Sequence, residues 1–348
     1  MSRISRRTSL ALSLLMVPAA LSSQNGAIAG VVTSRETKEP LAYTIIAVPA
    51  LGRELFSNDS GRFTLGGLPS GPLHLTIRRL GYGPSDITVE VRAGMDSIRI
   101  ELSRTAVALS AVLVRAFPTC SNPGPPSERD GLSLVTVFSQ LRMNADQYRL
   151  LSEEYPFESF MDVLRARKEQ GTDTIRPMHR ETLRVRSKSK WHYGPGKIVT
   201  GRWRQYTFNI PTLVDFADER FLAEHCFHYA GFDTVEARRM VRLDFLAADR
   251  IKAPDVNGSL YMDPETFQIR RSVLRLTKLP DLRALSGYEV TTDFAEVMPS
   301  VPIISQIFSV QSYDTTALRD QDAIYEVWRL QRVNFVGKKP GQEMIRTP

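Results

Sequence analysis

The stretch at residues 57–75, SNDSGRFTLGGLPSGPLHL, places four glycines and two prolines between short apolar runs. Glycines spaced in this way either cradle a bound phosphate or turn the chain. A phosphate cradle needs a helix directly after the glycines, so that its first amide groups point at the anion. The segment that follows, PLHLTIRRL at residues 72–80, alternates apolar and polar side chains and predicts a strand. The glycines are therefore expected to punctuate strands.

The same pattern extends over the whole N-terminal part of the chain. Short alternating runs recur at about 8 to 12 residue spacing and are separated by turn residues, which is typical of a β-sandwich. The seven runs occupy residues 27–32, 42–48, 53–57, 62–65, 72–80, 86–91 and 97–102.

This region resembles the carboxypeptidase regulatory-like domains, which are transthyretin-like, seven-stranded Greek-key sandwiches. The resemblance rests on GVV from Gly30, EPLAYTIIAV from Glu39, NDSGRFTLGGLPSG from Asn58 and RRLGY up to Tyr82. It covers residues 25–103. The resemblance implies a seven-stranded sandwich, and the family's name raises the hypothesis of a peptidase, which the catalytic motifs must support.

Residues 109–116, LSAVLVRA, resemble the strand that joins such a module to the plug of TonB-dependent outer-membrane receptors. This resemblance implies an alternative function, as a structural or accessory subunit of an outer-membrane complex. The chain then departs from those receptors, because the residues after 116 are too few for a plug followed by a large receptor barrel.

The motifs of common hydrolases are missing from the sequence. No histidine is followed by glutamate at the His-x-x-Glu spacing, and neither His-Glu-x-x-His nor Gly-x-Ser-x-Gly occurs. We therefore expect a protein that is not an enzyme and that has no cofactor. A hydrolase with an unrecognised site is kept as a second alternative.

Residues 1–22 have the three parts of a secretory signal peptide. Three arginines precede the apolar run at residues 10–21, which ends in small residues, so we expect export and cleavage near Ser22. Both the Sec and the twin-arginine routes fit. Removal of this segment lowers the formal net charge from +7 to +4, which argues against a nucleic-acid partner. The expected location is the periplasm, or the periplasmic face of the outer membrane, of a Gram-negative bacterium, with peripheral membrane contact at most.

Cys120 and Cys226 are the two cysteines of the chain. In an oxidising compartment an even pair predicts a disulfide, here one that closes a long loop. The alternative is a metal site, since a strand at EHCFH would place Glu224, Cys226 and His228 on one face and His225 on the other. We expect the disulfide and no metal.

The C-terminal part begins after a proline-rich linker at residues 104–131. A helix is predicted from residue 131 to about 144, because apolar residues from Leu134 to Leu141 recur at helical spacing. Period-two patterns then predict an antiparallel domain over residues 132–338, with a curved sheet or half-barrel covered by one or two helices. A short helical turn is expected near residues 213–217. The predicted strands occupy residues 183–193, 203–210, 225–231, 240–246, 258–276, 287–297, 302–313 and 324–336.

Two weaker resemblances concern this domain. The predicted hairpin GSLYMDPETFQIRR, with its turn at residues 263–266, is similar to hairpins of periplasmic lipoprotein-carrier-like half-barrels, which hold apolar chains. The domain as a whole resembles the second domain of bacterial envelope proteins that begin with a regulatory-like module. The second resemblance implies an architecture but no activity. From the expected export and the missing catalytic motifs, we expect a non-catalytic envelope protein that binds a glycan, lipid or peptide ligand or a partner protein.

The candidate ligand contacts lie in the first predicted strand of this domain. Arg184, Arg186, Lys188 and Lys190 alternate with uncharged residues and would form a cationic stripe, followed by Trp191. Such a stripe suits an anionic lipid or glycan. The alternative is a solvated edge-strand face whose cations deter aggregation.

Overall fold

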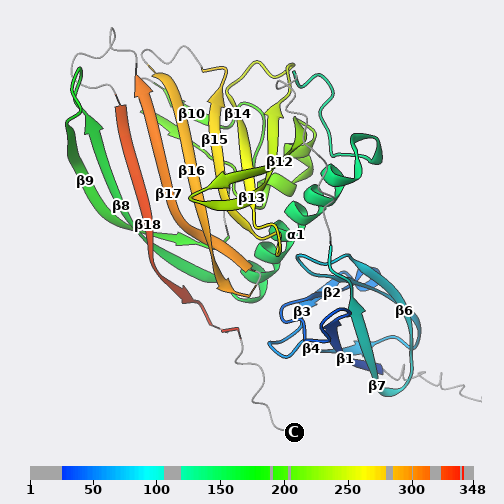
Figure 1. Ribbon diagram of the computed structural model, residues 1–348. Helices are drawn as coiled ribbons and strands as arrows, with labels where there is room; N and C mark the ends of the chain where they lie inside the picture. Colours follow the sequence, from blue (N-terminus) through cyan, green and yellow to red (C-terminus); the bar gives the residue numbers. More distant parts are fainter. Residues whose placement is uncertain are drawn as a thin grey trace, which may run out of the picture.

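The computed structural model describes residues 26–105, 119–188, 191–202, 205–279, 285–299, 301–313, 323–337 and 339–340 (Figure 1). Three predicted features lie outside the described residues: the signal peptide at residues 1–22, the segment at residues 109–116, and Lys190 of the cationic stripe. No helix within the described ranges is long and apolar enough to cross a bilayer.

The N-terminal module is a β-sandwich of two sheets, with strand orders β4-β1-β7 and β3-β2-β5-β6. Strands β1 and β7 pair in parallel, and the other neighbours are antiparallel. All seven predicted strands are confirmed. Their bounds are β1 Gly26–Ser34, β2 Ile45–Val48, β3 Arg53–Phe56, β4 Arg62–Leu68, β5 Gly71–Arg78, β6 Ser85–Val91 and β7 Gly94–Leu102.

The glycines of residues 57–75 turn the chain, as expected. Gly61 has a φ of +68°, and a Cβ there would lie 2.6 Å from the carbonyl oxygen of Val32. The side-chain oxygen of Asn58 accepts hydrogen bonds from the backbone amides of Ser60 and Arg62, which closes the turn before β4. Only glycine combines this conformation with so close an approach.

The C-terminal module consists of helix α1, Leu132–Glu154, and a nine-stranded sheet. The sheet has the order β12-β13-β14-β15-β16-β17-β18-β8-β9, and every neighbouring pair is antiparallel. The expected fold class is therefore confirmed. The strand bounds are β8 Phe157–Lys168, β9 Ile175–Arg186, β12 His225–Val235, β13 Arg238–Ala247, β14 Asp255–Met262, β15 Ile269–Thr277, β16 Leu285–Met298, β17 Val301–Tyr313 and β18 Ala323–Phe335.

Between β9 and β12 lie a small hairpin and two short helical segments. Strands β10, Val199–Arg202, and β11, Gln205–Phe208, form the hairpin. The 3-10 turn Asp215–Ala217 confirms the expected turn, and helix α2, Glu219–Leu222, follows it. A further 3-10 turn, Glu128–Asp130, precedes α1, and Pro49–Leu51 forms another in the sandwich.

Several predicted bounds in this module are wrong. Helix α1 continues ten residues past Asn144, because its second half buries polar as well as apolar side chains and so loses the apolar period. The sequence did not predict strand β8, because apolar and polar residues alternate only weakly along it. The strand predicted at residues 183–193 instead starts at Ile175 and ends at Arg186.

Helix α1 is packed between the sheet and the sandwich. Val137, Phe138 and Leu141 join a core that includes Phe245 and Leu274 of the sheet. On the sandwich side, the backbone amide of Gly81 donates to the side-chain oxygen of Gln140 over 2.8 Å. The helix therefore holds the two modules together.

Charged groups reinforce this junction. Arg78 of β5 lies 2.8 Å from Glu54 of β3 and 2.6 Å from Asp146 of α1. Arg149, one turn further along α1, also pairs with Glu54. These four side chains are all partly buried, so the network fixes the orientation of the sandwich on the helix.

Asn144 provides a test of this packing. Its amide nitrogen donates to the carbonyl of Phe267 over 2.9 Å, its oxygen accepts from the amide of Ile269 over 2.9 Å, and the side chain is fully buried. We expect Asn144→Leu to lower the free energy of unfolding by about 2–3 kcal/mol, because two buried backbone groups lose their partners. Urea denaturation measures the change. Asn334→Leu, the same substitution at an exposed position of β18, should change stability by less than about 0.5 kcal/mol; equal losses in both variants would contradict the assignment.

Candidate functional site

The two faces of the nine-stranded sheet have different surroundings. We call the face that α1 covers the inner face; Phe245, Leu274 and Val290 lie on it. The opposite, outer face carries the alternate side chains of the same strands. In Figure 1, α1 runs from the first residues of β17 towards the β12–β13 end of the sheet, and β18, β8 and β9 lie on the side away from it.

Three adjoining cavities form a groove on the inner face. The largest has a volume of 380 Å³ and lies between Tyr148 of α1, Leu213 and Phe294. A second of 220 Å³ and a third of 80 Å³ continue along the sheet. Ile304 of β17 lines all three, so they are one site, which we call the inner groove. The largest cavity alone falls within the range of about 300–1,000 Å³ that is usual for small-molecule sites.

Apolar side chains form most of the groove wall. The 380 Å³ cavity is lined by Leu213, Val214, Phe294 and Ile304 together with the aromatic rings of Tyr148 and Trp191. The smaller cavities add Phe157, Met161, Phe208, Ile210, Val290, Ile303, Ile307 and Trp328. A wall of this composition favours the apolar part of a ligand.

Two tyrosines of the groove wall have raised pKa values. The Tyr148 hydroxyl donates to the carbonyl of Ser187 over 3.1 Å, and burial raises the pKa of this phenol to about 12. Tyr288 stacks on Phe208 with ring centroids 4.2 Å apart, and burial also raises its pKa to about 12. Both tyrosines therefore stay protonated at neutral pH.

At the far end of the groove, the indole nitrogen of Trp328 donates to Glu326 over 2.7 Å. The other carboxylate oxygen of Glu326 accepts from Arg165. The side chain of Glu326 is only 14% exposed, and these two donors compensate its burial.

The residues expected to contact a ligand do not form one stripe. Lys188 lies in a bend after β9, and Lys188 and Trp191 line the 380 Å³ cavity. Arg186 contributes to the cavity wall, but its guanidinium nitrogen is 3.8 Å from Glu158. Arg184 lies 3.6 Å from the same carboxylate, on the outer face. The predicted continuous strand is thus corrected, and only its C-terminal part reaches the groove.

Sequence reasoning missed most of the groove. Phe294, Ile304, Ile307 and Trp328 lie on predicted strands, but nothing in their local pattern separates a groove wall from an ordinary core. The inner-face alternation of residues 302–313 is the one signal that could have indicated a shared surface.

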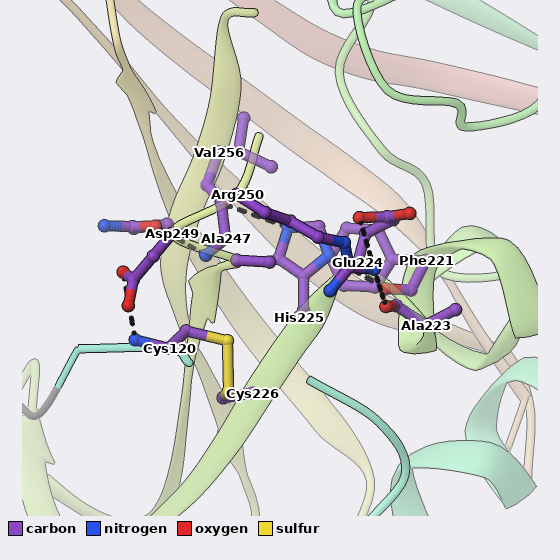
Figure 2. The surroundings of a disulfide bond; sticks show 12 residues. Cys120, Phe221, Ala223, Glu224, His225, Cys226, Ala247, Asp249, Arg250 and Val256 are labelled. Atoms are coloured by element: carbon purple, nitrogen blue, oxygen red, sulfur yellow. Dashed lines mark hydrogen bonds and ion pairs between the residues drawn. A yellow bond between two sulfur atoms is a disulfide. The ribbon is translucent and has the colours of Figure 1, made fainter. Parts of the chain in front are cut away.

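Cys120 and Cys226 form a disulfide, with Cα atoms 5.6 Å apart (Figure 2). Beside it, the amide of Cys120 donates to the Asp249 carboxylate over 3.2 Å, and the amide of Asp249 donates to the carbonyl of Cys120 over 2.9 Å. The linker is thereby fastened to β12 and to the turn after β13. Because its sulfur is bonded to Cys120, Cys226 is not free to bind a metal. The described part of the chain contains no group of three or more potential metal ligands.

A buried polar cluster lies next to the disulfide. The Tyr193 hydroxyl donates to Asp255 over 2.6 Å, and the His225 ring stacks on Phe221 with centroids 3.8 Å apart. Figure 2 shows His225 between Phe221 and Val256, whose carbonyls lie 2.8 and 3.2 Å from its ring nitrogens. Burial, with the bond to Asp255, raises the pKa of Tyr193 well above its ordinary value. All three titratable side chains have 0% exposure, so a substrate cannot reach them and their role is structural.

Residues 28–114 match the family model of the CarboxypepD_reg-like domain. The resemblance of the N-terminal module to this family is confirmed, and the module is a CarboxypepD_reg-like domain. No curated protein matches the chain.

Solved structures of low similarity include a minor pilin of Streptococcus agalactiae, at 20% identity, 26% coverage of this chain, 49% of the pilin and a TM-score of 0.22. The chain thus spans about half the length of that pilin. A putative outer membrane lipoprotein-sorting protein domain of Vibrio parahaemolyticus has 7% identity, coverage of 59% and 96%, and a TM-score of 0.30. A DUF1329 family protein of Desulfovibrio piger has 8% identity, coverage of 58% and 95%, and a TM-score of 0.30. These low scores establish neither a shared fold nor a shared function.

The disulfide leads to a stability prediction. Its sequence separation of 106 residues restricts the unfolded chain strongly, so we expect Cys226→Ser to lower the free energy of unfolding by about 2–4 kcal/mol. Thiol titration of denatured, unreduced protein should find no free thiol. The reduced wild-type protein should match the variant in stability, and a variant as stable as the oxidised wild type would contradict a structural role for this bond.

Proposed function

We propose that this chain is a non-catalytic, exported envelope protein whose C-terminal module binds an amphipathic molecule in the inner groove. The observation that carries the proposal is the run of three cavities with a common apolar wall at Ile304. The apolar chain of the ligand lies along β17, and its polar part remains at an opening. The sandwich orients this module through its contacts with α1.

Charged residues at one opening favour an anionic head group. Lys188 and His192 are exposed at the 380 Å³ cavity, next to the Trp191 ring. Arg149 lies at the same cavity but is already paired with Glu54 and Glu153. Lys188 is thus the cation that we assign to the head group, with Trp191 packing beside it.

Occupation of the groove can be tested with a fluorescent fatty acid. We expect Ile304→Trp to raise the Kd for cis-parinaric acid at least about tenfold, because the larger side chain fills the space that all three cavities share. Fluorescence titration measures the Kd. Val273→Trp, on the outer face of β15, is the matched control and should bind normally. The proposal fails if both variants bind as the wild type does, provided that their thermal unfolding temperatures are similar.

The head-group contact has its own test. We expect Lys188→Glu to raise the Kd for cis-parinaric acid roughly threefold to tenfold. The variant replaces one exposed attractive contact with the ligand's carboxylate by a repulsive one. Binding of the uncharged methyl ester should not change. Lys252→Glu, an exposed lysine away from the groove, serves as the control. Equal weakening of acid and ester would show that Lys188 acts on the groove's shape and not on the charge of the ligand.

A further inference from the structure

The outer face of the sheet carries an exposed apolar patch on β17, β18 and β8. Phe308 pairs with Val327, and Val327 pairs with Leu164, so the three side chains lie side by side on one face. Tyr325 stacks on Phe308 with ring centroids 6.2 Å apart. We call these residues, with Val310, the outer patch.

The outer patch belongs to none of the hydrophobic clusters of the described residues. Phe308 is 36% exposed and Leu164 is 39% exposed, although β17 and β8 each have a neighbouring strand on both sides. Neighbouring apolar side chains that remain open to solvent on a sheet face commonly mark an interaction surface.

Arginine side chains of β18 and β9 lie along one side of the outer patch. Arg329 and Arg332 are exposed on β18, and the Arg332 guanidinium lies 4.3 Å from the centre of the Phe160 ring on β8. Arg180, Arg184 and Arg186 of the edge strand β9 have exposed fractions of 72%, 58% and 72%.

Carboxylates balance only part of this charge. Arg180 pairs with Asp162 at 2.8 Å, while Arg184 and Arg186 share Glu158. On this part of the outer face, five arginines therefore stand against two carboxylates, and three positive charges are in excess.

We propose that the outer patch and its arginines dock the protein on the surface of an anionic lipid bilayer. Phe308, Leu164 and Tyr325 enter the interface between head groups and acyl chains, where aromatic side chains are favoured. The arginines contact the lipid phosphates, to which a guanidinium binds with two parallel hydrogen bonds. Charge complementarity selects this occupant: a second copy of the chain would bring the same excess of arginines against its own.

This surface lies on the opposite side of the sheet from the inner groove. Ile307 of β17 and Trp328 of β18 line the groove. Phe308, which follows Ile307, and Val327, which precedes Trp328, lie on the opposite face and belong to the outer patch. Arg186 borders both surfaces, but Phe308, Leu164 and Arg184 line none of the three cavities, so the docking surface can be altered without changing the groove. The docking surface also gives a role to Arg184 and Arg186, which the groove does not use as charged groups.

The test is co-sedimentation of the chain from residue 23 onward with two kinds of vesicle, either phosphatidylcholine alone or an equal mixture of phosphatidylglycerol and phosphatidylcholine. All described strands and helices are kept, and the apolar run at residues 10–21 is removed because it would bind lipid by itself. We expect binding to the mixed vesicles and at least about tenfold weaker binding to phosphatidylcholine, with the difference reduced by salt.

Two variants separate the contribution of the arginine charges from that of the apolar side chains. The triple change Arg184→Gln, Arg329→Gln and Arg332→Gln should weaken binding to the mixed vesicles about a hundredfold, since each arginine near an anionic leaflet contributes about fivefold. Leu164→Ser with Phe308→Ser should also weaken it about tenfold, through loss of inserted apolar surface. Arg99→Gln is the control, because Arg99 is exposed on β7 of the sandwich, away from the nine-stranded sheet.

The remaining outcomes would overturn the proposal. Equal binding to both kinds of vesicle, or binding that the two variants leave unchanged, excludes this surface. Sedimentation equilibrium that shows a dimer, lost in the Leu164→Ser and Phe308→Ser variant, would mean that a second copy covers the patch. Ile304→Trp should bind vesicles as the unsubstituted chain does; if it does not, the vesicle signal comes from lipid in the groove.

Discussion

The burial of helix α1 on two sides is the constraint on which the rest of the structure depends. One side of the helix completes the core of the nine-stranded sheet through Val137, Phe138 and Leu141. The other side meets the sandwich, where Gln140 accepts from Gly81 and Asp146 pairs with Arg78. A helix buried on two sides carries buried polar side chains in addition to its apolar stripe, because these side chains must satisfy backbone groups of both neighbours.

This arrangement also sets where a ligand can bind. The helix covers part of the inner face, and the residues after β9 cover more of it through Trp191 and Leu213. The cavities remain where these covering elements do not fill the space above β16, β17 and β18. The disulfide, with Asp249, and the buried contact of Tyr193 with Asp255 fix the linker and the segment that follows β9. The segments that bound the groove are thus held in place by bonds that lie outside the groove.

The sheet separates two kinds of surface by the alternation of its strands. On β17 and β18, Ile307 and Trp328 face the groove, and Phe308 and Val327 face outwards. The same geometry divides the basic segment at the end of β9. Arg184 pairs with Glu158 on the outer face, Arg186 lies near the same carboxylate and also borders the groove, and Lys188, after the strand has ended, lies at the groove. An amphipathic ligand inside and a lipid surface outside would both suit a protein that works at a membrane.

The sequence by itself determined the N-terminal sandwich, the disulfide pairing and the antiparallel character of the second module. These features rest on local signals: period-two alternation, glycines such as Gly61 at turns, and a single pair of cysteines. The tertiary structure alone decided the length of α1, the position of β8 and the groove. Buried polar residues such as Gln140 and Asn144 look like solvent-facing residues in a sequence, because their partners, Gly81, Phe267 and Ile269, are distant in the chain. Likewise, the basic segment at residues 184–190 has one alternation in sequence, but β9 ends at Arg186, so Arg184 and Lys188 lie on different surfaces, since a side chain's direction depends on the strand continuing.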